Sequence, residues 1–268
     1  MSKAETIRSA RLGKKELRLV RMQGRFFGLS DGRIVVEGDD AEDVWRQLHD
    51  EAGKSNPKYF GFDGARKRFL KFFPNGFQTA EYVEKERDYK LAAKKRLDET
   101  VPLEKAADGK GFGEAVLAVF RFTNMLSPFE KTRLQDVLRG PHADDFIRAA
   151  ARFTLEGGKT NLLAMEQALK PHDSAKWTVV TYLPFLWRPE THMFLKPETT
   201  KDFAGRVGHR FAEEYEAKLH LPVYESLLDL VAKTQRELVD MDPRDRIDIQ
   251  SFIWVVGNYP ERGEGASE

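Results

Sequence analysis

The chain has 268 residues, of which 41% are hydrophobic, 11% aromatic and 32% charged, and its formal net charge is +1. This composition suits one large domain or two small ones with a packed core, and it excludes a uniformly acidic or basic protein. The absence of cysteine excludes disulfides, thiolate zinc sites and cysteine nucleophiles. No apolar run reaches the roughly 18 residues of a membrane span, and residues 1–16 contain no apolar signal core. We therefore expect a soluble, cytoplasmic protein without a membrane partner.

The N-terminal 55 residues have the pattern of a small β-β-β-α unit. Gln23-Gly24 and Asp31-Gly32 are typical of tight hairpin turns, because glycine accepts the positive φ that these turns require. Asp39 or Asp40 is placed to cap a helix over residues 40–52. The expected strands of this antiparallel sheet are residues 16–22, 25–30 and 33–37.

Residues 56–258 predict a larger helical domain, and residues 259–268 a disordered tail. Two stretches, 177–187 and 247–256, are apolar enough to be either buried strands or buried helices, and their helical surroundings favour helices. The fold class is therefore α+β and predominantly α, with a small three-stranded antiparallel sheet and its helix packed on a multi-helix domain. Helices are expected near residues 64–72, 79–99, 112–125, 128–138, 142–156, 160–169, 174–186, 198–206, 209–219, 221–240 and 247–256.

Charge is distributed unevenly along the chain. Residues 1–100 carry 22 Lys and Arg against 17 Asp and Glu, whereas residues 201–268 carry 9 against 14. The densest basic stretch, residues 63–96, also contains many aromatic residues, a combination that binds phosphates and stacks on bases. A solvated helix face, or packing between the basic and acidic ends, would explain the same pattern, and the phenylalanines of this stretch fit a core. The predicted nucleic-acid-binding residues are Arg66, Lys67, Arg68, Lys71, Lys90, Lys94 and Lys95.

No complete catalytic motif is present, so the catalytic residues stay unknown and no metal or cofactor is predicted. Gly157-Gly158-Lys159-Thr160 lacks the first glycine of a phosphate-binding loop, and a helix stop followed by an N-cap at Thr160 explains it. Gly109–Gly113 is expected to be a flexible link. The six histidines show no metal-binding spacing. Glu216-Ala217-Lys218 and Asp88-Tyr89-Lys90 match a nuclease triplet, but both fall in expected helices.

Trp177–Pro197 resembles a pattern found in helical modules of bacterial restriction and DNA-processing proteins, and also the helical core of helix-hairpin-helix DNA glycosylases. Ile247–Trp254 is similar to the closing helix of the restriction-associated modules. The hairpin signature Leu-x-Gly-x-Gly is not kept, because Leu155-Glu156-Gly157-Gly158 lacks the residue between the glycines. The resemblance implies a DNA-linked, defence-related context and transfers no active site.

Three functions follow as hypotheses. The first is a non-enzymatic nucleic-acid-associated module, based on the basic, aromatic stretch and the resemblance. The second is a metal-dependent nuclease, so whether the chain is an enzyme stays open. The third is a scaffold whose acidic C-terminal third binds a protein partner.

Overall fold

The computed structural model describes residues 4–12 and 15–260. The chain divides into two compact units: residues 1–68 together with 201–215 form the first, and residues 69–200 together with 216–268 form the second. The first unit thus extends past the boundary expected near residue 55 and includes a later segment of the chain. Within residues 4–12 and 15–260, none of the helices combines the length and apolar composition that crossing a bilayer requires.

The first unit contains a four-stranded antiparallel meander, one strand more than expected. The additional strand comes first, and every one of its side chains is exposed or half-buried, so its sequence lacks the apolar alternation that reveals a strand. The two predicted hairpin turns are confirmed, since Gln23, Gly24, Asp31 and Gly32 all have positive φ. The strands are β1 (Glu5–Leu12), β2 (Lys15–Met22), β3 (Arg25–Ser30) and β4 (Arg33–Gly38), paired in that order.

Helix α1 (Ala41–Gly53) packs on this sheet, and the Asp40 side chain caps it by accepting a hydrogen bond from the Asp43 N–H. The apolar core of this part consists of Leu17, Leu19, Val44, Trp45, Leu48 and Ala52. At its C-terminal end, α1 approaches the turn after α12 (Pro197–Val207) so closely that a Cβ on Gly53 would lie 2.6 Å from the Gly208 Cα. Helix α13 (Phe211–Glu214) follows that turn, and it is much shorter than the helix expected over residues 209–219.

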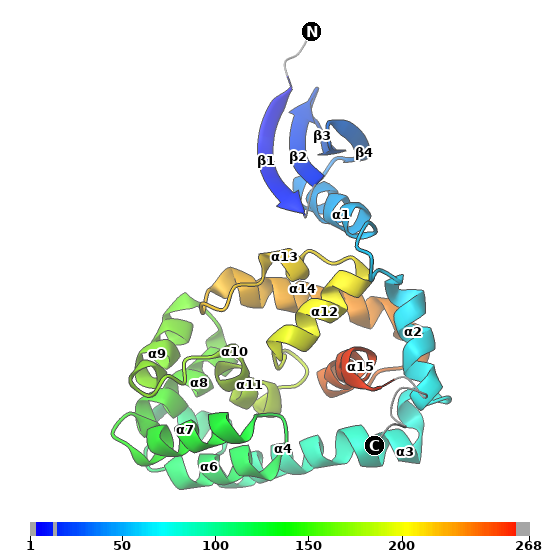
Figure 1. Cartoon of the computed structure of the whole chain (residues 1–268). Coiled ribbons are helices and arrows are strands. Elements are labelled where there is room, and N and C mark those ends of the chain that lie inside the picture. The colour runs from blue at the N-terminus through cyan, green and yellow to red at the C-terminus, as the bar shows by residue number, and fades with distance from the viewer. Residues whose placement is uncertain (1–3, 13–14, 261–268) are drawn as a thin grey trace. The chain divides into compact units, whose positions relative to one another are not determined.

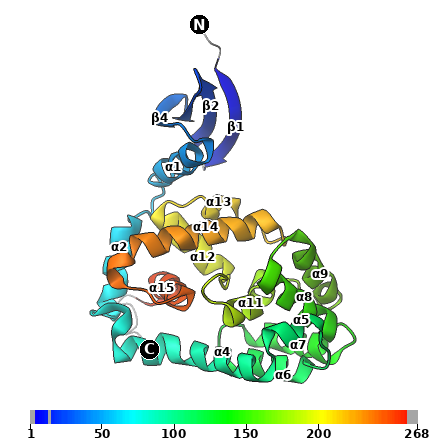
Figure 2. The ribbon, with the colours of Figure 1, turned by 180° about the vertical axis from the view of Figure 1, so that it is seen from behind.

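The second unit is built from helices (Figures 1 and 2). Most expected helices are found within a few residues of their predicted bounds, whereas α5 was not expected and the segment 174–186 holds two short helices. Three short 3₁₀ turns lie at Gly76–Gln78, Lys170–His172 and Val239–Met241. Helix α2 (Gly61–Phe72) runs from the first unit into this one. The remaining helices are α3 (Ala80–Tyr82), α4 (Asp88–Thr100), α5 (Leu103–Asp108), α6 (Gly113–Phe122), α7 (Pro128–Arg139), α8 (Ala143–Glu156), α9 (Lys159–Leu169), α10 (Trp177–Val180), α11 (Tyr182–Trp187), α14 (Leu221–Glu237) and α15 (Arg246–Asn258).

Both apolar stretches whose secondary structure was ambiguous are helical. Residues 177–187 form α10 and α11, and nearly all of α15 is buried. Helix α15 contacts α14 and the segment that joins α3 to α4, and both views show it between them (Figures 1 and 2). Its position explains why most of its side chains are buried, including the polar ones Asp248, Gln250 and Ser251.

The helix expected over residues 79–99 is interrupted by a π-helical turn, η2 (Val83–Arg87), between α3 and α4. Thr79 caps its start as predicted, because its hydroxyl accepts a hydrogen bond from the Tyr82 N–H. A π turn adds one residue to the helix and often marks a functional position. Glu86 and Arg87, at the end of this turn, are both buried.

Candidate functional site

The predicted nucleic-acid-binding residues do not share one exposed face. On α2, Lys67 and Lys71 are exposed and lie one turn apart, whereas Arg66 and Arg68 are half-buried. On α4, Lys95 is exposed, Lys94 is half-buried and Lys90 is fully buried. Lys94 donates to the Asp98 carboxylate at 2.9 Å and to the Trp187 carbonyl at 3.1 Å.

Lys90 therefore requires a correction, because its ammonium is inside the second unit and out of reach of a nucleic-acid phosphate. Basic residues on a long helix look alike in sequence whether they face solvent or the interior. The alternative interpretation of the aromatic residues is confirmed: Phe69, Phe73 and Phe77 are buried and pack around Tyr82.

A buried ionic network joins the π turn to α15. The Arg87 guanidinium donates to Asp245 at 2.6 Å and to Asp248 at 2.8 Å. Asp248 also accepts hydrogen bonds from Arg244 at 3.0 Å and from the Tyr82 hydroxyl at 2.7 Å. Burial opposes the charge on Asp248, but the hydrogen bonds from Arg244 and Tyr82 and the charge of Arg87 lower its pKa. Two of the acidic residues near the C-terminus thus neutralise internal cations.

Next to this network, Lys90 holds the Glu86 carboxylate in place. Lys90 Nζ donates to Ser251 Oγ at 2.7 Å and lies 3.5 Å from Glu86 Oε2. The Tyr259 hydroxyl donates to Glu86 Oε1 at 2.7 Å. Burial lowers the pKa of Lys90 to about 8, although the charge of Glu86 opposes that shift. Tyr259 lies in the tail predicted to be disordered, but it is packed; residues 261–268 of that tail lie outside the described residues.

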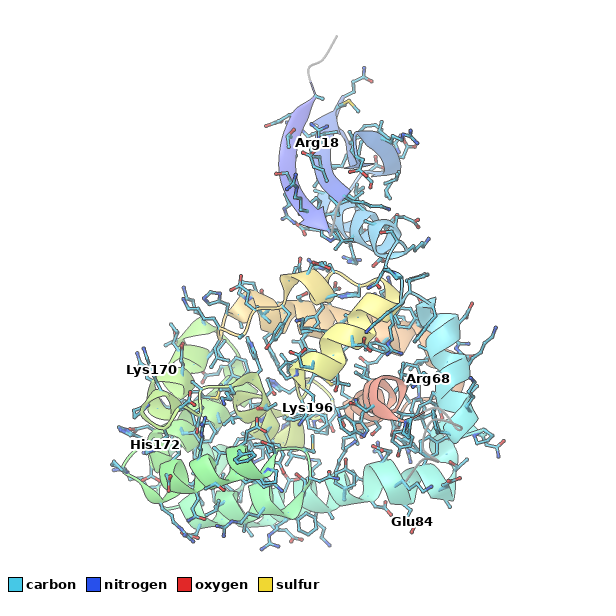
Figure 3. The ribbon with its side chains drawn as sticks, in the orientation of Figure 1. Arg18, Arg68, Glu84, Lys170, His172 and Lys196 are labelled. Atoms are coloured by element: carbon cyan, nitrogen blue, oxygen red, sulfur yellow. The ribbon has the colours of Figure 1, made fainter. Side chains whose placement is uncertain are left out.

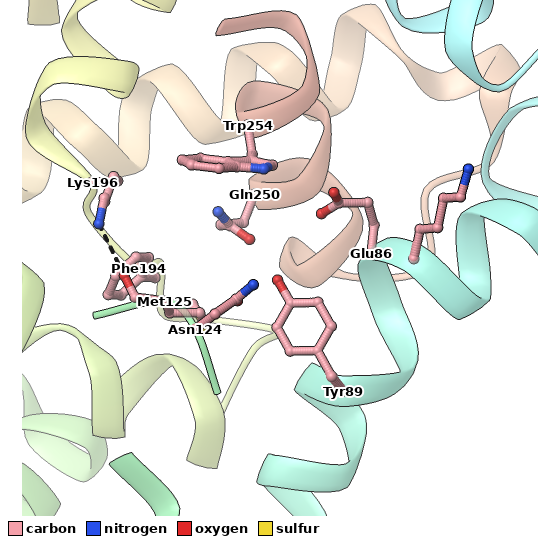
Figure 4. Close-up of a pocket in the computed structure, with 9 residues that line it drawn as sticks. Glu86, Tyr89, Asn124, Met125, Phe194, Lys196, Gln250 and Trp254 are labelled. Atoms are coloured by element: carbon pink, nitrogen blue, oxygen red, sulfur yellow. Dashed lines mark hydrogen bonds between the residues drawn. The ribbon is translucent and has the colours of Figure 1, made fainter. Parts of the chain in front are cut away.

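The other side of Glu86 lines a cavity of about 90 Å³ inside the second unit (Figure 4). We call it the α4–α15 cavity. Its walls come from the π turn, α4, α15, the loop after α6 and the segment before α12. Its lining residues are Lys85, Glu86, Tyr89, Asn124, Met125, Phe194, Lys196, Gln250 and Trp254.

Polar groups in the α4–α15 cavity point toward its centre. Figure 4 shows the Glu86 carboxylate, the Tyr89 hydroxyl and the Gln250 amide directed inward beneath the Trp254 ring. Burial, with the charge of Glu86 second, raises the pKa of Tyr89, so its hydroxyl keeps its proton and can donate. Lys196 lies opposite Glu86 and donates one hydrogen bond to the Met125 carbonyl at 3.1 Å.

One buried acceptor in this cavity has no hydrogen-bond partner in the described part of the chain. The Gln250 side chain is only 7% exposed, and its Oε1 atom accepts no hydrogen bond. A buried amide oxygen left unpaired costs about 1–3 kcal/mol, so such atoms usually indicate a bound water or ligand. The unpaired Gln250 oxygen therefore indicates that the cavity binds a water or ligand that donates hydrogen bonds.

Exposed aromatic rings lie on both sides of the cavity residues Asn124 and Met125 along the chain. Phe122 is 46% exposed, two residues before Asn124, and the Arg96 guanidinium lies 5.9 Å from the centre of its ring. Phe129 is 83% exposed at the start of α7. Exposed aromatic side chains beside a cation are the surface that stacks on unpaired bases.

The other motifs do not form a site. Glu216–Lys218 lies outside any helix, contrary to expectation, and Asp88–Lys90 begins α4 with its lysine buried. The glycines Gly157 and Gly158 end α8, and α9 begins at Lys159 with Gly158, not Thr160, as its N-cap. Among residues 4–12 and 15–260, no three His, Cys, Asp or Glu side chains are grouped so that they could hold a metal ion.

Sequence reasoning missed Glu86, Asn124, Gln250 and Trp254 as site residues. One signal was present, because Gln250 and Trp254 are four residues apart on α15 and therefore share a helix face. Comparison of the chain with protein-family models, with curated proteins and with solved structures finds no match.

Proposed function

We propose that the protein binds single-stranded nucleic acid without catalysing a reaction, and that one base of the strand enters the α4–α15 cavity. The observation that carries the proposal is a cavity that combines aromatic walls with the unpartnered Gln250 oxygen. Aromatic rings stack on any base, and a buried amide binds the hydrogen-bonding edge of a base.

The size of the cavity supports one base and not a whole nucleotide. Its volume of about 90 Å³ is well below the roughly 300–1,000 Å³ of pockets for drug-sized ligands. The sugar and phosphate would stay outside, where the Lys85 side chain is exposed. Phe122 and Phe129 would then stack on neighbouring bases.

The sequence resemblance agrees with this proposal. The stretches 177–197 and 247–254, which resemble DNA-linked modules, supply four lining residues of the cavity: Phe194, Lys196, Gln250 and Trp254. The bacterial, defence-related setting and the cytoplasmic location implied earlier are part of the same proposal. The scaffold hypothesis is less favoured, because Asp245 and Asp248 of the acidic C-terminal third are engaged by Arg87.

Fluorescence anisotropy with labelled oligonucleotides tests the proposal. The full chain should bind a single strand of about 12 nucleotides at about 50 mM salt, and more tightly than it binds the matching duplex. Trp254→Ala should weaken single-strand binding about tenfold, because stacking contributes roughly 1–3 kcal/mol per base. Leu155→Ala is the control, since Leu155 is 47% exposed and does not line the cavity. No single-strand binding at low salt, or tighter binding to the duplex, would contradict the proposal.

A further inference from the structure

We propose that the α4–α15 cavity selects cytosine among the bases. This inference rests on the proposed function and adds which base the cavity prefers. It depends on the placement of one carboxylate, one ammonium and one unpartnered amide oxygen around a space large enough for a single ring.

The two ends of the cavity have opposite hydrogen-bonding character. Figure 4 shows the Glu86 carboxylate, an acceptor, on one side and the Lys196 ammonium, a donor, on the other. A base that fits must therefore present a donor at one end of its edge and an acceptor at the other. Cytosine does so with its N4 amino group and its O2 carbonyl.

The Glu86 carboxylate is fixed in position and keeps capacity to accept. Its side chain is 5% exposed, Tyr259 donates to Oε1, and Lys90 lies 3.5 Å from Oε2. A carboxylate has about four lone-pair sites, so roughly two remain for a ligand. Glu and Asp are the side chains that accept from the cytosine N4 amino group in nucleic-acid recognition.

Gln250 accounts for the second hydrogen of that amino group. Its unpartnered Oε1 atom is an acceptor that the described residues leave unsatisfied, and Figure 4 places its amide beside the space between Glu86 and Lys196. The N4 amino group has two hydrogens, so one can be donated to Glu86 and the other to Gln250. Lys196 uses one of its three N–H groups on the Met125 carbonyl and can donate another to O2.

The other bases fit less well for separate reasons. Thymine and uracil place a carbonyl at both ends, so one carbonyl oxygen would face the Glu86 carboxylate and be repelled. Adenine has the amino donor but no carbonyl for Lys196. Guanine has the required polarity, but it needs room for a second ring in a cavity of about 90 Å³.

Competition between homopolymeric strands tests the inference with the unmodified full chain. At about 50 mM salt, oligocytidine of about 12 nucleotides should bind roughly tenfold more tightly than oligothymidine or oligoadenosine. Free cytidine monophosphate should displace a bound strand at a lower concentration than uridine monophosphate does, because only the former carries the cytosine base.

In Glu86→Gln, the affinity for oligocytidine divided by the affinity for oligothymidine should fall to nearly one. An amide both donates and accepts hydrogen bonds, so it no longer repels the carbonyl of thymine. Glu84→Gln is the matched control: it removes the same charge from the same π turn, but Glu84 is exposed and points away from the helices (Figure 3). Gln250→Leu is a second variant, which keeps Glu86 and its contact with Lys90. This change should weaken the binding of oligocytidine more than the binding of oligothymidine. Thermal unfolding of each variant separates loss of fold from loss of preference.

Each outcome supports or overturns a distinct statement. Equal binding of all strands by the unmodified chain would overturn the inference and leave the proposed function intact. Binding of free cytidine monophosphate without binding of any strand would keep the base preference and overturn the proposed function. Binding of neither would overturn both.

Discussion

At the level of single residues, the polar lining of the α4–α15 cavity depends on the contact between Lys90 and Glu86. Lys90 is 1% exposed, and the charge and hydrogen bond of Glu86, followed by the charge of Asp248, oppose the lowering of its pKa by burial. Such a pair contributes little net stability, because desolvation offsets the attraction. Its effect is to fix the direction of the Glu86 carboxylate.

Lys90→Met should change how stability depends on pH. Burial lowers the pKa of Lys90 to about 8, below its ordinary value of 10.5, so the unfolded chain holds more protons than the folded chain between these values. The free energy of unfolding should therefore rise above pH 8, by on the order of 1 kcal/mol per pH unit, as the folded state loses its buried charge. Urea unfolding between pH 8 and 9 measures this slope, because tyrosines of the unfolded chain, whose ordinary pKa is 10.0, still keep most of their protons there while burial raises the pKa of folded tyrosines such as Tyr89.

The slope should be absent in Lys90→Met and present in Lys95→Met, which removes the same charge from an exposed position of α4. Equal slopes in the two variants would show that the buried ammonium is not the group responsible.

At the scale of helices and strands, the sequence predicted most elements because their apolar residues recur at regular spacing. It missed β1, whose side chains are mostly exposed and show no buried face. It also missed the π turn at Val83–Arg87, because adding one residue to a helix leaves no mark in composition or capping. The cavity was therefore not predictable, since the π turn and the segment before α12 approach α15 only through tertiary packing.

The close approach of α1 to the turn after α12 makes Gly53 sensitive to substitution. A Cβ at this position would lie 2.6 Å from the Gly208 Cα and 2.8 Å from its carbonyl oxygen, and backbone atoms cannot move aside as a side chain can. Gly53→Ala should lower the free energy of unfolding by about 1–3 kcal/mol, which thermal or urea denaturation measures.

Gly205→Ala is the control for this prediction. Its new Cβ would lie 2.8 Å from the end of the Asn56 side chain and in ordinary contact, at 4.0 Å, with the Ala212 Cβ, so no backbone atom is in the way, and alanine favours the helix that contains it. A loss of stability in Gly205→Ala as large as that in Gly53→Ala would contradict the account of this contact.

For the molecule as a whole, a net charge of +1 means that a strand is not held by a broad positive field. Many basic side chains are paired with carboxylates, as Arg87 is with Asp245 and Arg139 with Glu114. Affinity in this account comes from stacking and from one enclosed base, with Lys85 and Lys196 as the cations at the cavity.

This distribution predicts a weak salt dependence of strand binding. One phosphate contact, at the exposed Lys85, gives a slope of about −0.7 for the logarithm of affinity against the logarithm of salt concentration, and Lys85→Met should bring the slope close to zero. Anisotropy titrations over a range of salt concentrations measure both slopes. A slope steeper than about −4 would indicate six or more phosphate contacts and a basic surface outside the cavity.

Photochemical cross-linking of a bound cytosine-containing strand, followed by mass spectrometry of the peptides, tests the central claim most directly. The account predicts cross-links to the aromatic side chains that line the α4–α15 cavity, namely Tyr89, Phe194 and Trp254. Cross-links confined to the exposed lysine face of α2, at Lys67 and Lys71, would contradict it.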